Sequence, residues 1–410
     1  MKKHLRHVFK KKKVCKALSK RNTRSSSSRS MTNSELIPVD LIIEILSRLP
    51  AKSISRFRCV SKEWASILHR QYFTNLFLKM SSSRPRLLFI FRTDDDKLFF
   101  LSAHQPLNPD QNSSPLVVDY HMSFSTKTCS PFHMAPVFGL VCSKPIKVFL
   151  GIVYRNVNTM IYNPSTGQSI PLPRIQSMVN TRTVLGYDPI NKQYKVLCMK
   201  DRINPLYTVQ ILTLGTGTLS WKTIGCSLLH FPVCGWICIN GVLYYPGDMG
   251  NTFPKRYTIV CFDVRFEKFK FVEPPDNIDV TWLSTMINYT GKLGIVLVDD
   301  FTAGFTRKTT SLELWVLDDV VKNKWSQHIY VFPPMWKNLV ADSILYIAGM
   351  TSNGEIVFSS RYLIYPFYIF FYNFAKNSIV RVPIQGFESI HIKRQYIHTY
   401  IDHIEDVKQM

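Results

Sequence analysis

Residues 36–50 read Leu36-Ile37-Pro38-Val39-Asp40-Leu41-Ile42-Ile43-Glu44-Ile45-Leu46-Ser47-Arg48-Leu49-Pro50. Pro38 and Asp40 form a helix-start signal, because proline lacks the N–H that a first turn leaves unpaired and an acid favours the positive helix N-terminus. The apolar residues that follow lie at offsets 0, 1, 4, 5 and 8, and they are Leu41, Ile42, Ile45, Leu46 and Leu49. This spacing is one stripe of a 3.6-residue period, so we expect an amphipathic helix that ends at Pro50.

The helical pattern continues beyond Pro50. Ile54 and Phe57 predict a short second helix, and Ser61 can cap a third that carries Trp64. Apolar residues from position 73 to position 80 predict a fourth helix. Residues 31–80 should therefore form a small all-α domain, whose apolar surface exceeds what three short helices can cover and so indicates a partner.

After a serine run at 81–83, short strands alternate with turns. An aromatic or β-branched strand runs into a polar turn at positions 163, 213, 263, 318 and 373, which are about 50–55 residues apart. Between them recurs a strand marked by glycine, at Gly139, Gly186, Gly241, Gly291 and Gly354. A repeat of this length with four strands predicts a propeller blade of kelch-like size. Five blades are visible and a sixth can lie in residues 84–140, while a large twisted sandwich with coincidental spacing is the alternative.

The predicted fold class is thus α+β by domain, with a small all-α domain before a large all-β domain at 84–390, a β-propeller of five or six blades, and a C-terminal tail at 391–410.

The net charge is +23, of which residues 1–30 supply +12 with no acid, and the rest carries 39 basic and 28 acidic side chains, or +11. Such a segment has little to bury and should be a disordered basic tail. Its basic clusters are candidates for nuclear import, and they are Lys10, Lys11, Lys12, Lys13, Lys20 and Arg21. A solvated tail without a role, an organellar transit peptide and a true start at Met31 are alternatives.

Several function classes find no support. Nine cysteines form no CxxC pair, no apolar stretch follows the basic N-terminus, and the longest apolar run, 363–372, is shorter than the ~20 residues of a membrane helix. We expect a soluble protein in a reducing compartment. The cluster of His230, Cys234 and Cys238 lacks a fourth metal ligand nearby, and Asp94, Asp95 and Asp96 read as a hairpin turn. No catalytic motif is present, so we expect no enzyme activity, no metal and no cofactor.

The helical domain resembles an F-box over the stretch from Leu36 to Trp64, including Leu36-Ile37-Pro38, Asp40-Leu41-Ile42, Arg48-Leu49-Pro50 and Arg58-Cys59-Val60-Ser61. The remainder, from about residue 87 to 383, is similar to the F-box-associated domain of a large plant family. The matching motifs are Asn163-Pro164-Ser165-Thr166-Gly167, Leu185-Gly186-Tyr187-Asp188-Pro189, Gln193-Tyr194-Lys195-Val196-Leu197, Ile239-Asn240-Gly241-Val242-Leu243-Tyr244-Tyr245, Cys261-Phe262-Asp263-Val264-Arg265 and Leu312-Glu313-Leu314-Trp315.

This resemblance implies the substrate-recognition subunit of a ubiquitin ligase of the Skp-cullin-F-box type. In that family the F-box binds a Skp-type adaptor and, through it, a cullin scaffold. Carried over by position, the residues that form or support the docking face are Leu36, Pro38, Leu41, Ile42, Ile45, Leu46, Leu49, Pro50, Cys59, Val60 and Trp64. An apolar stripe on a small helical unit is consistent with this role, and a stable docking face usually buries ~800 Å² per partner. We expect Phe57 and Leu68 to be mostly core, and Leu36, Pro38, Ile42 and Trp64 to be mostly contact.

The β-domain would bind an unknown target protein through loops at the blade ends, and the candidates are Asp201–Leu206, Asp248–Arg256 and Asp300–Thr310. Such a chain would work in the nucleus, the cytoplasm or both, away from membranes. Two alternatives remain: a nucleic-acid-binding protein that acts through the basic tail, and an F-box protein that binds the adaptor without joining a cullin.

Overall fold

The computed structural model describes residues 37–410 apart from 111–112, 126–128, 131–133, 146–147, 150–151, 154–158, 176–180, 201–207, 234, 251–255, 277, 282–283, 298–303 and 391–394. The chain divides into two compact units, residues 1–42 and residues 43–410. The predicted basic clusters at 10–13 and 20–21 and the predicted docking residue Leu36 lie outside the described residues.

Four helices come first, as the sequence predicts, and they are α2 (Val39–Ser47), α3 (Ala51–Phe57), α4 (Lys62–His69) and α5 (Gln71–Ser82). The Ser61 hydroxyl accepts a hydrogen bond from the backbone N–H of Trp64 at 3.1 Å, which confirms the predicted N-cap of α4. Phe73 and Phe77 of α5 are fully buried one helical turn apart and supply most of its apolar core.

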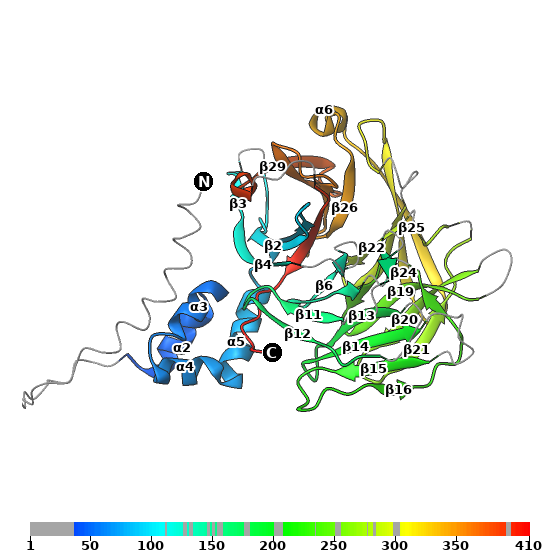
Figure 1. Ribbon diagram of the computed structural model, residues 1–410. Helices are drawn as coiled ribbons and strands as arrows, with labels where there is room; N and C mark the ends of the chain where they lie inside the picture. The colour runs from blue at the N-terminus through cyan, green and yellow to red at the C-terminus, as the bar shows by residue number, and fades with distance from the viewer. Residues whose placement is uncertain are drawn as a thin grey trace, which may run out of the picture. The chain divides into compact units, whose positions relative to one another are not determined.

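After these helices the described chain forms six sheets of four or five strands, which are the six blades of a β-propeller (Figure 1), and two small two-stranded sheets. Blade 2 contains β6 (Pro136–Val137), β7 (Leu140–Cys142), β11 (Met160–Asn163) and β12 (Gln168–Pro171). Blade 3 contains β13 (Thr181–Asp188), β14 (Gln193–Lys200), β15 (Val209–Thr213) and β16 (Lys222–Ile224). Blade 4 contains β18 (Ile237–Ile239), β19 (Val242–Asp248), β20 (Tyr257–Asp263) and β21 (Lys268–Val272), with β17 (Phe231–Pro232) beside β19. Blades 5 and 6 contain β22 (Ser284–Tyr289), β23 (Lys292–Leu297), β24 (Ser311–Asp319) and β25 (Lys324–Val331); and β26 (Leu345–Met350), β27 (Glu355–Ser360), β28 (Phe367–Asn373) and β29 (Ser378–Gln385), with β3 (Leu116–Val117) added in parallel.

Blade 1 is assembled from both ends of the propeller sequence. Its strand order is β30 (Ile397–His403), β1 (Arg86–Arg92), β2 (Lys97–His104) and β4 (Asp119–Ser125), so the last strand of the chain is the inner strand of the first blade. Figure 1 shows β30, in red, returning to the cyan strands. This corrects our expectation that residues 391–410 are a tail separate from a domain at 84–390. It also explains why the repeat was hard to detect in residues 84–140. Residues 86–125 supply only three of the four strands of blade 1, and β30 supplies the fourth.

The predicted repeat is present. The third strands of blades 2 to 6 end at Asn163, Thr213, Asp263, Asp319 and Asn373, within one residue of each predicted turn. Four of the five predicted glycines occupy the first hairpin of their blades at positive φ, whereas Gly186 lies inside β13, a first strand. A glycine within a strand, as predicted, is therefore found only at Gly186 among these five, while the other four lie in the hairpin before a second strand.

Apolar clusters join each blade to the next around the whole ring. The cluster between blades 3 and 4, for example, brings Leu197 and Ile211 against Tyr245 and Phe262. Corresponding clusters join blades 1 and 2, 2 and 3, 4 and 5, 5 and 6, and 6 and 1. Such a closed ring has no free sheet face, which makes it a rigid support for the loops at its two ends.

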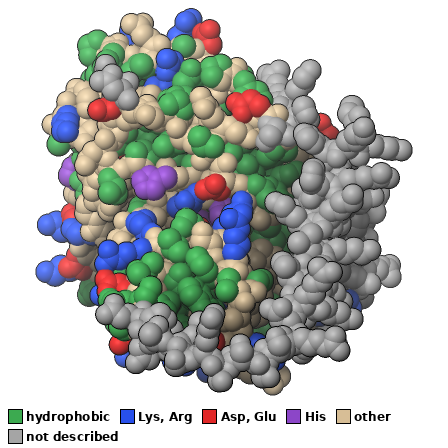
Figure 2. Space-filling view, turned by 90° about the vertical axis from the view of Figure 1, so that its left-hand side faces the viewer, with side chains coloured by type: hydrophobic (Ala, Val, Ile, Leu, Met, Phe, Trp, Pro, Cys, Tyr) green, Lys and Arg blue, Asp and Glu red, His purple; other side chains and the backbone are tan. Residues whose placement is uncertain are grey.

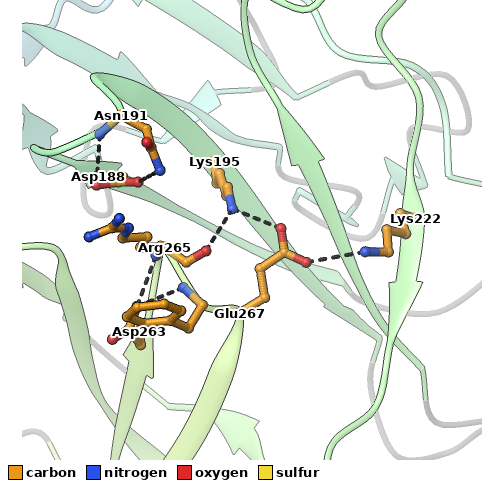
Figure 3. Close-up of polar contacts among 8 residues, drawn as sticks. Asp188, Asn191, Lys195, Lys222, Asp263, Arg265 and Glu267 are labelled. Atoms are coloured by element: carbon orange, nitrogen blue, oxygen red, sulfur yellow. Dashed lines mark hydrogen bonds and ion pairs between the residues drawn. The ribbon is translucent and has the colours of Figure 1, made fainter.

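A polar contact adds to the junction of blades 3 and 4 (Figure 3). The Lys195 ammonium donates to the Glu267 carboxylate at 2.8 Å and to the backbone carbonyl of Arg265 at 3.4 Å. Lys222 lies 3.4 Å from the other Glu267 oxygen. Burial alone would raise the pKa of Glu267, but the hydrogen bonds and charges of Lys195 and Lys222 lower it. The turn after β20 is thereby held against blade 3.

Candidate functional site

Helix α2 carries apolar residues on two different faces. Ile43 and Leu46 are buried, with 6% and 3% of their surface exposed. Leu41 and Ile45 are one helical turn apart and are 50% and 56% exposed. Exposed leucine and isoleucine side chains at i and i+4 form a ridge suited to contact with another protein.

The other predicted docking residues differ in exposure. Pro38, Pro50, Cys59 and Val60 are exposed, with Val60 at 64%. Three are half-buried, Ile42, Leu49 and Trp64, and one, Leu46, is buried and can only support the others. Figure 2 faces the side on which α2, α3 and α4 lie and shows hydrophobic side chains gathered in its lower half, bordered by Lys and Arg.

The predicted division between core and contact residues is partly met. Leu68 is fully buried, as expected. Phe57 is only half-buried, and its ring stacks on that of Trp64 with 5.2 Å between centroids. The prediction also passed over Ile37 and Val39, which are 58% and 44% exposed. They flank Pro38, and a stripe counted from Leu41 onward does not include them.

The propeller has two distinct ends. We call the end that holds the connections between second and third strands the distal end, and the opposite end the proximal end. The candidate loops at 248–256 and 300–310 join the second and third strands of blades 4 and 5, so their described residues belong to the distal end. Residues 201–206 and parts of the other two lie outside the described residues. Helix α5 leads into β1 at the proximal end, so the helices and these loops are at opposite ends of blade strands.

Part of the distal end is described in detail at blades 6 and 1. The Arg361 guanidinium lies 3.6 Å from the centroid of the Tyr346 ring, and the hydroxyls of Tyr362 and Tyr396 are 2.7 Å apart. That hydrogen bond, together with burial, raises the pKa of Tyr396. Next to them Ile364 is 54% exposed. Aromatic rings with an arginine and an exposed aliphatic side chain are typical of protein-binding surfaces.

This group was not predicted from the sequence, because its members come from residues 346 to 396 and no local motif joins them. The only available signal was the density of aromatic residues in that part of the chain.

The described residues hold no group of three or more His, Cys, Asp or Glu side chains that could bind a metal ion. His230 is fully buried, and its Nε2 is 2.8 Å from the Tyr245 hydroxyl and its Nδ1 is 3.0 Å from the Leu228 carbonyl. Cys238 contacts the backbone of Tyr187, and Cys234 lies outside the described residues.

Asp96 ends the turn between β1 and β2, as predicted for the acidic run. Within the described part of the chain, no helix is both long and apolar enough to cross a membrane.

Comparison with known proteins gives consistent matches over both parts of the chain. Residues 35–76 match the F-box domain family, and residues 86–404 match the family described as the F-box associated beta propeller domain. The chain is 42% identical to F-box protein DOR of Arabidopsis thaliana, over 92% of this chain and 94% of that protein. It is 43% identical to the F-box protein At3g49450 of the same plant, over 97% of this chain and 98% of that protein.

Among solved structures, a similar one is an oligogalacturonate lyase in complex with manganese, at 9% sequence identity and a TM-score of 0.37, covering 72% of this chain and 77% of that one. A likeness at this level carries no argument about function.

Proposed function

Since the chain belongs to the plant F-box proteins that carry an F-box-associated β-propeller domain, we propose that it is the substrate-recognition subunit of a Skp-cullin-F-box ubiquitin ligase. Proteins that combine an F-box with an F-box-associated β-propeller generally recognise substrates for such ligases. The observation that carries the proposal is the pair Leu41 and Ile45, two half-exposed apolar side chains one turn apart on the first F-box helix. A Skp-type adaptor would cover them.

The target would bind at the distal end of the propeller. The proximal end is the one that leads into helix α5, whereas the distal end carries the half-buried pair Tyr346 and Arg361 with the exposed Ile364 beside it. Catalysis of ubiquitin transfer then requires no chemistry from this chain. Holding a target lysine near a charged conjugating enzyme raises its effective concentration, which is sufficient to accelerate transfer.

The test is co-purification of the full chain with a Skp-type adaptor, comparing wild type with the double variant Leu41→Asp/Ile45→Asp. We expect a stable wild-type complex that the variant weakens by about 100-fold or more, because two unpaired charges would be buried in the interface. The matched control is Ile190→Asp/Val321→Asp, which places the same charges at propeller positions that are 65% and 82% exposed. The control should bind as wild type does.

Two outcomes would count against the proposal. If wild type does not bind the adaptor, the ligase role fails and the basic tail becomes the leading feature. If the adaptor binds but a cullin does not join the complex, the chain is an adaptor-binding protein outside the ligase.

A further inference from the structure

The last seven residues of the chain, 404–410, follow β30 and form a segment that we call the C-terminal strap. Its first four residues, Ile404, Glu405, Asp406 and Val407, are between 1% and 9% exposed. Two of them are acids, and burial raises the pKa of both carboxyl groups. Buried polar groups of this kind are stable only when neighbouring groups hydrogen-bond to them.

The F-box helices supply one set of partners. The backbone N–H of Ala51, the first residue of α3, donates to the Glu405 carboxylate at 3.3 Å. Helix α3 begins after Pro50, whose side chain cannot cap it, so the strap provides the acceptor that this helix end lacks. The Ser81 hydroxyl of α5 accepts from the backbone N–H of Glu405 at 2.8 Å.

The other end of α3 is tied to the same segment. Arg58, its C-cap residue, donates to the backbone carbonyl of Val407 at 2.6 Å and to that of Leu68 at 3.1 Å. Both ends of α3 therefore contact the strap, while Leu68 belongs to α4. Figure 1 shows the C-terminus beside α5.

Blade 2 of the propeller supplies the second set of partners. The Asn163 amide donates to the backbone carbonyl of Asp406 at 3.0 Å and to that of Lys408 at 3.3 Å. The Ser165 hydroxyl accepts from the N–H of Asp406 at 3.1 Å, and the Gln168 side-chain oxygen accepts from the N–H of Met410 at 3.0 Å. Asn163 ends β11, Ser165 lies in the turn that follows, and Gln168 begins β12.

The identity of residue 163 fits this contact. Its side-chain oxygen accepts from the N–H of Ser165 at 3.0 Å, the same local turn that Asp263 and Asp319 make in blades 4 and 5. An aspartate would thus be sufficient for the turn. Only the amide of an asparagine can also donate to the strap.

Backbone shape at blade 2 also accommodates the strap. Gly139 lies at the first hairpin of this blade, and a Cβ placed on it would be 2.7 Å from the Ile404 carbonyl oxygen. The strap thus contacts the F-box helices through one edge and blade 2 through the other.

We propose that the C-terminal strap fixes helices α3 and α5 to the propeller, so that residues 404–408 set the position of these two F-box helices relative to the distal end. Residues Asn163, Arg58 and Glu405 are positioning residues in this arrangement. The consequence for ubiquitin transfer rests on the proposed function, since the strap would set the distance between target and conjugating enzyme. The structural role does not depend on it.

The test is hydrogen exchange of the full-length protein, comparing wild type with Asn163→Asp. This variant keeps the turn but loses both donors and faces two carbonyl oxygens with a carboxylate. Amides of α3 and α5 should exchange at least about tenfold faster, while those of β19 and β20 in blade 4 stay unchanged. The control is Asp319→Asn, a change of the same size at the corresponding turn of blade 5, and it should leave α3 and α5 unchanged. A second variant that ends at residue 403 keeps β30 and removes the whole strap, and its effect should be larger.

Unchanged exchange in α3 and α5 in both variants would overturn the proposal. Faster exchange throughout the propeller in both would also overturn it, because the strap would then stabilise the ring rather than position the helices. Adaptor binding is measured separately on Asn163→Asp, which leaves Leu41 and Ile45 intact. If wild type also fails to bind the adaptor, the ligase role is rejected, but the hydrogen-exchange result still tests the strap.

Discussion

Single residues at the blade junctions decide how closely the blades approach. Gly186 of β13 faces Val264, which is fully buried in the turn after β20. A Cβ on Gly186 would be 2.7 Å from a methyl carbon of Val264, although the backbone there has no unusual φ. The glycine is therefore required by space alone.

We expect Gly186→Ala to destabilise the protein by about 1–3 kcal/mol, because the added methyl group forces blades 3 and 4 apart. Urea unfolding gives the free energy. The matched control is Gly225→Ala, where a Cβ would meet nothing within 4 Å. Adding Val264→Ala to Gly186→Ala should restore part of the loss, and a purely additive double variant would contradict this packing explanation.

Asn163 shows what sequence reasoning can reach at this scale and what it cannot. Its place in a polar turn was predictable from the strand before it and the glycine after it. Its second contact was not, because the strap carbonyl it binds belongs to residue 406, 243 positions away.

Among the elements, helices with local signals were predicted well. Pro50 precedes α3, Ser61 caps α4, and α5 has apolar residues at helical spacing, so each of the three helices could be placed from a nearby signal. Strand β30 has no such local signal for its position, since its partner β1 lies some 300 residues earlier. Pairing between distant strands is specified only by the folded ring, and the sequence therefore indicated a tail.

Strand β30 also carries buried titratable groups, and they predict a pH dependence. Burial, together with the charges of His121 and Arg86, lowers the pKa of His403 from 6.5 to about 3. Between these pH values the unfolded chain binds a proton at this residue that the folded protein does not, so stability is lost as pH falls. The midpoint of thermal unfolding should therefore decrease more for wild type than for His403→Leu when pH is lowered from 7 to 5.

The neighbouring acids contribute a pH dependence of stability with the opposite sign, so the proteins that are compared must carry the same acids. Burial raises the pKa of Asp402, Glu405 and Asp406, so their contribution is present at low pH and is lost as pH rises. Both proteins retain these acids, so the difference between them isolates His403. His69→Leu, at an exposed position, is the control, and equal slopes in wild type and His403→Leu would contradict the assignment.

For the whole molecule, the sequence predicted an F-box followed by a propeller but not which end of the ring each candidate loop occupies. The described residues of the loops at 248–256 and 300–310 share the distal end because blades 4 and 5 repeat the same strand order. The number of blades also depended on closure, since blade 1 is completed by β30, the last described strand.

The basic segment at residues 1–30 can be separated experimentally from both domains. We propose that it directs nuclear import, and we expect its deletion to leave adaptor binding unchanged while a fluorescent fusion loses nuclear accumulation. Replacing Lys10, Lys11, Lys12 and Lys13 with glutamine should have the same effect. If deletion instead abolishes salt-sensitive binding to nucleic acid, the alternative function through this tail gains support.

Closure by β30 has a consequence for how the protein is made. Residues 397–403 emerge from the ribosome after the F-box helices and after every other described strand of the ring. Until then blade 1 lacks its inner strand and exposes the apolar side chains that β30 later covers. The ring therefore closes only after residues 397–403 have emerged, and a product that ends before residue 397 would carry F-box helices beside an open, aggregation-prone propeller.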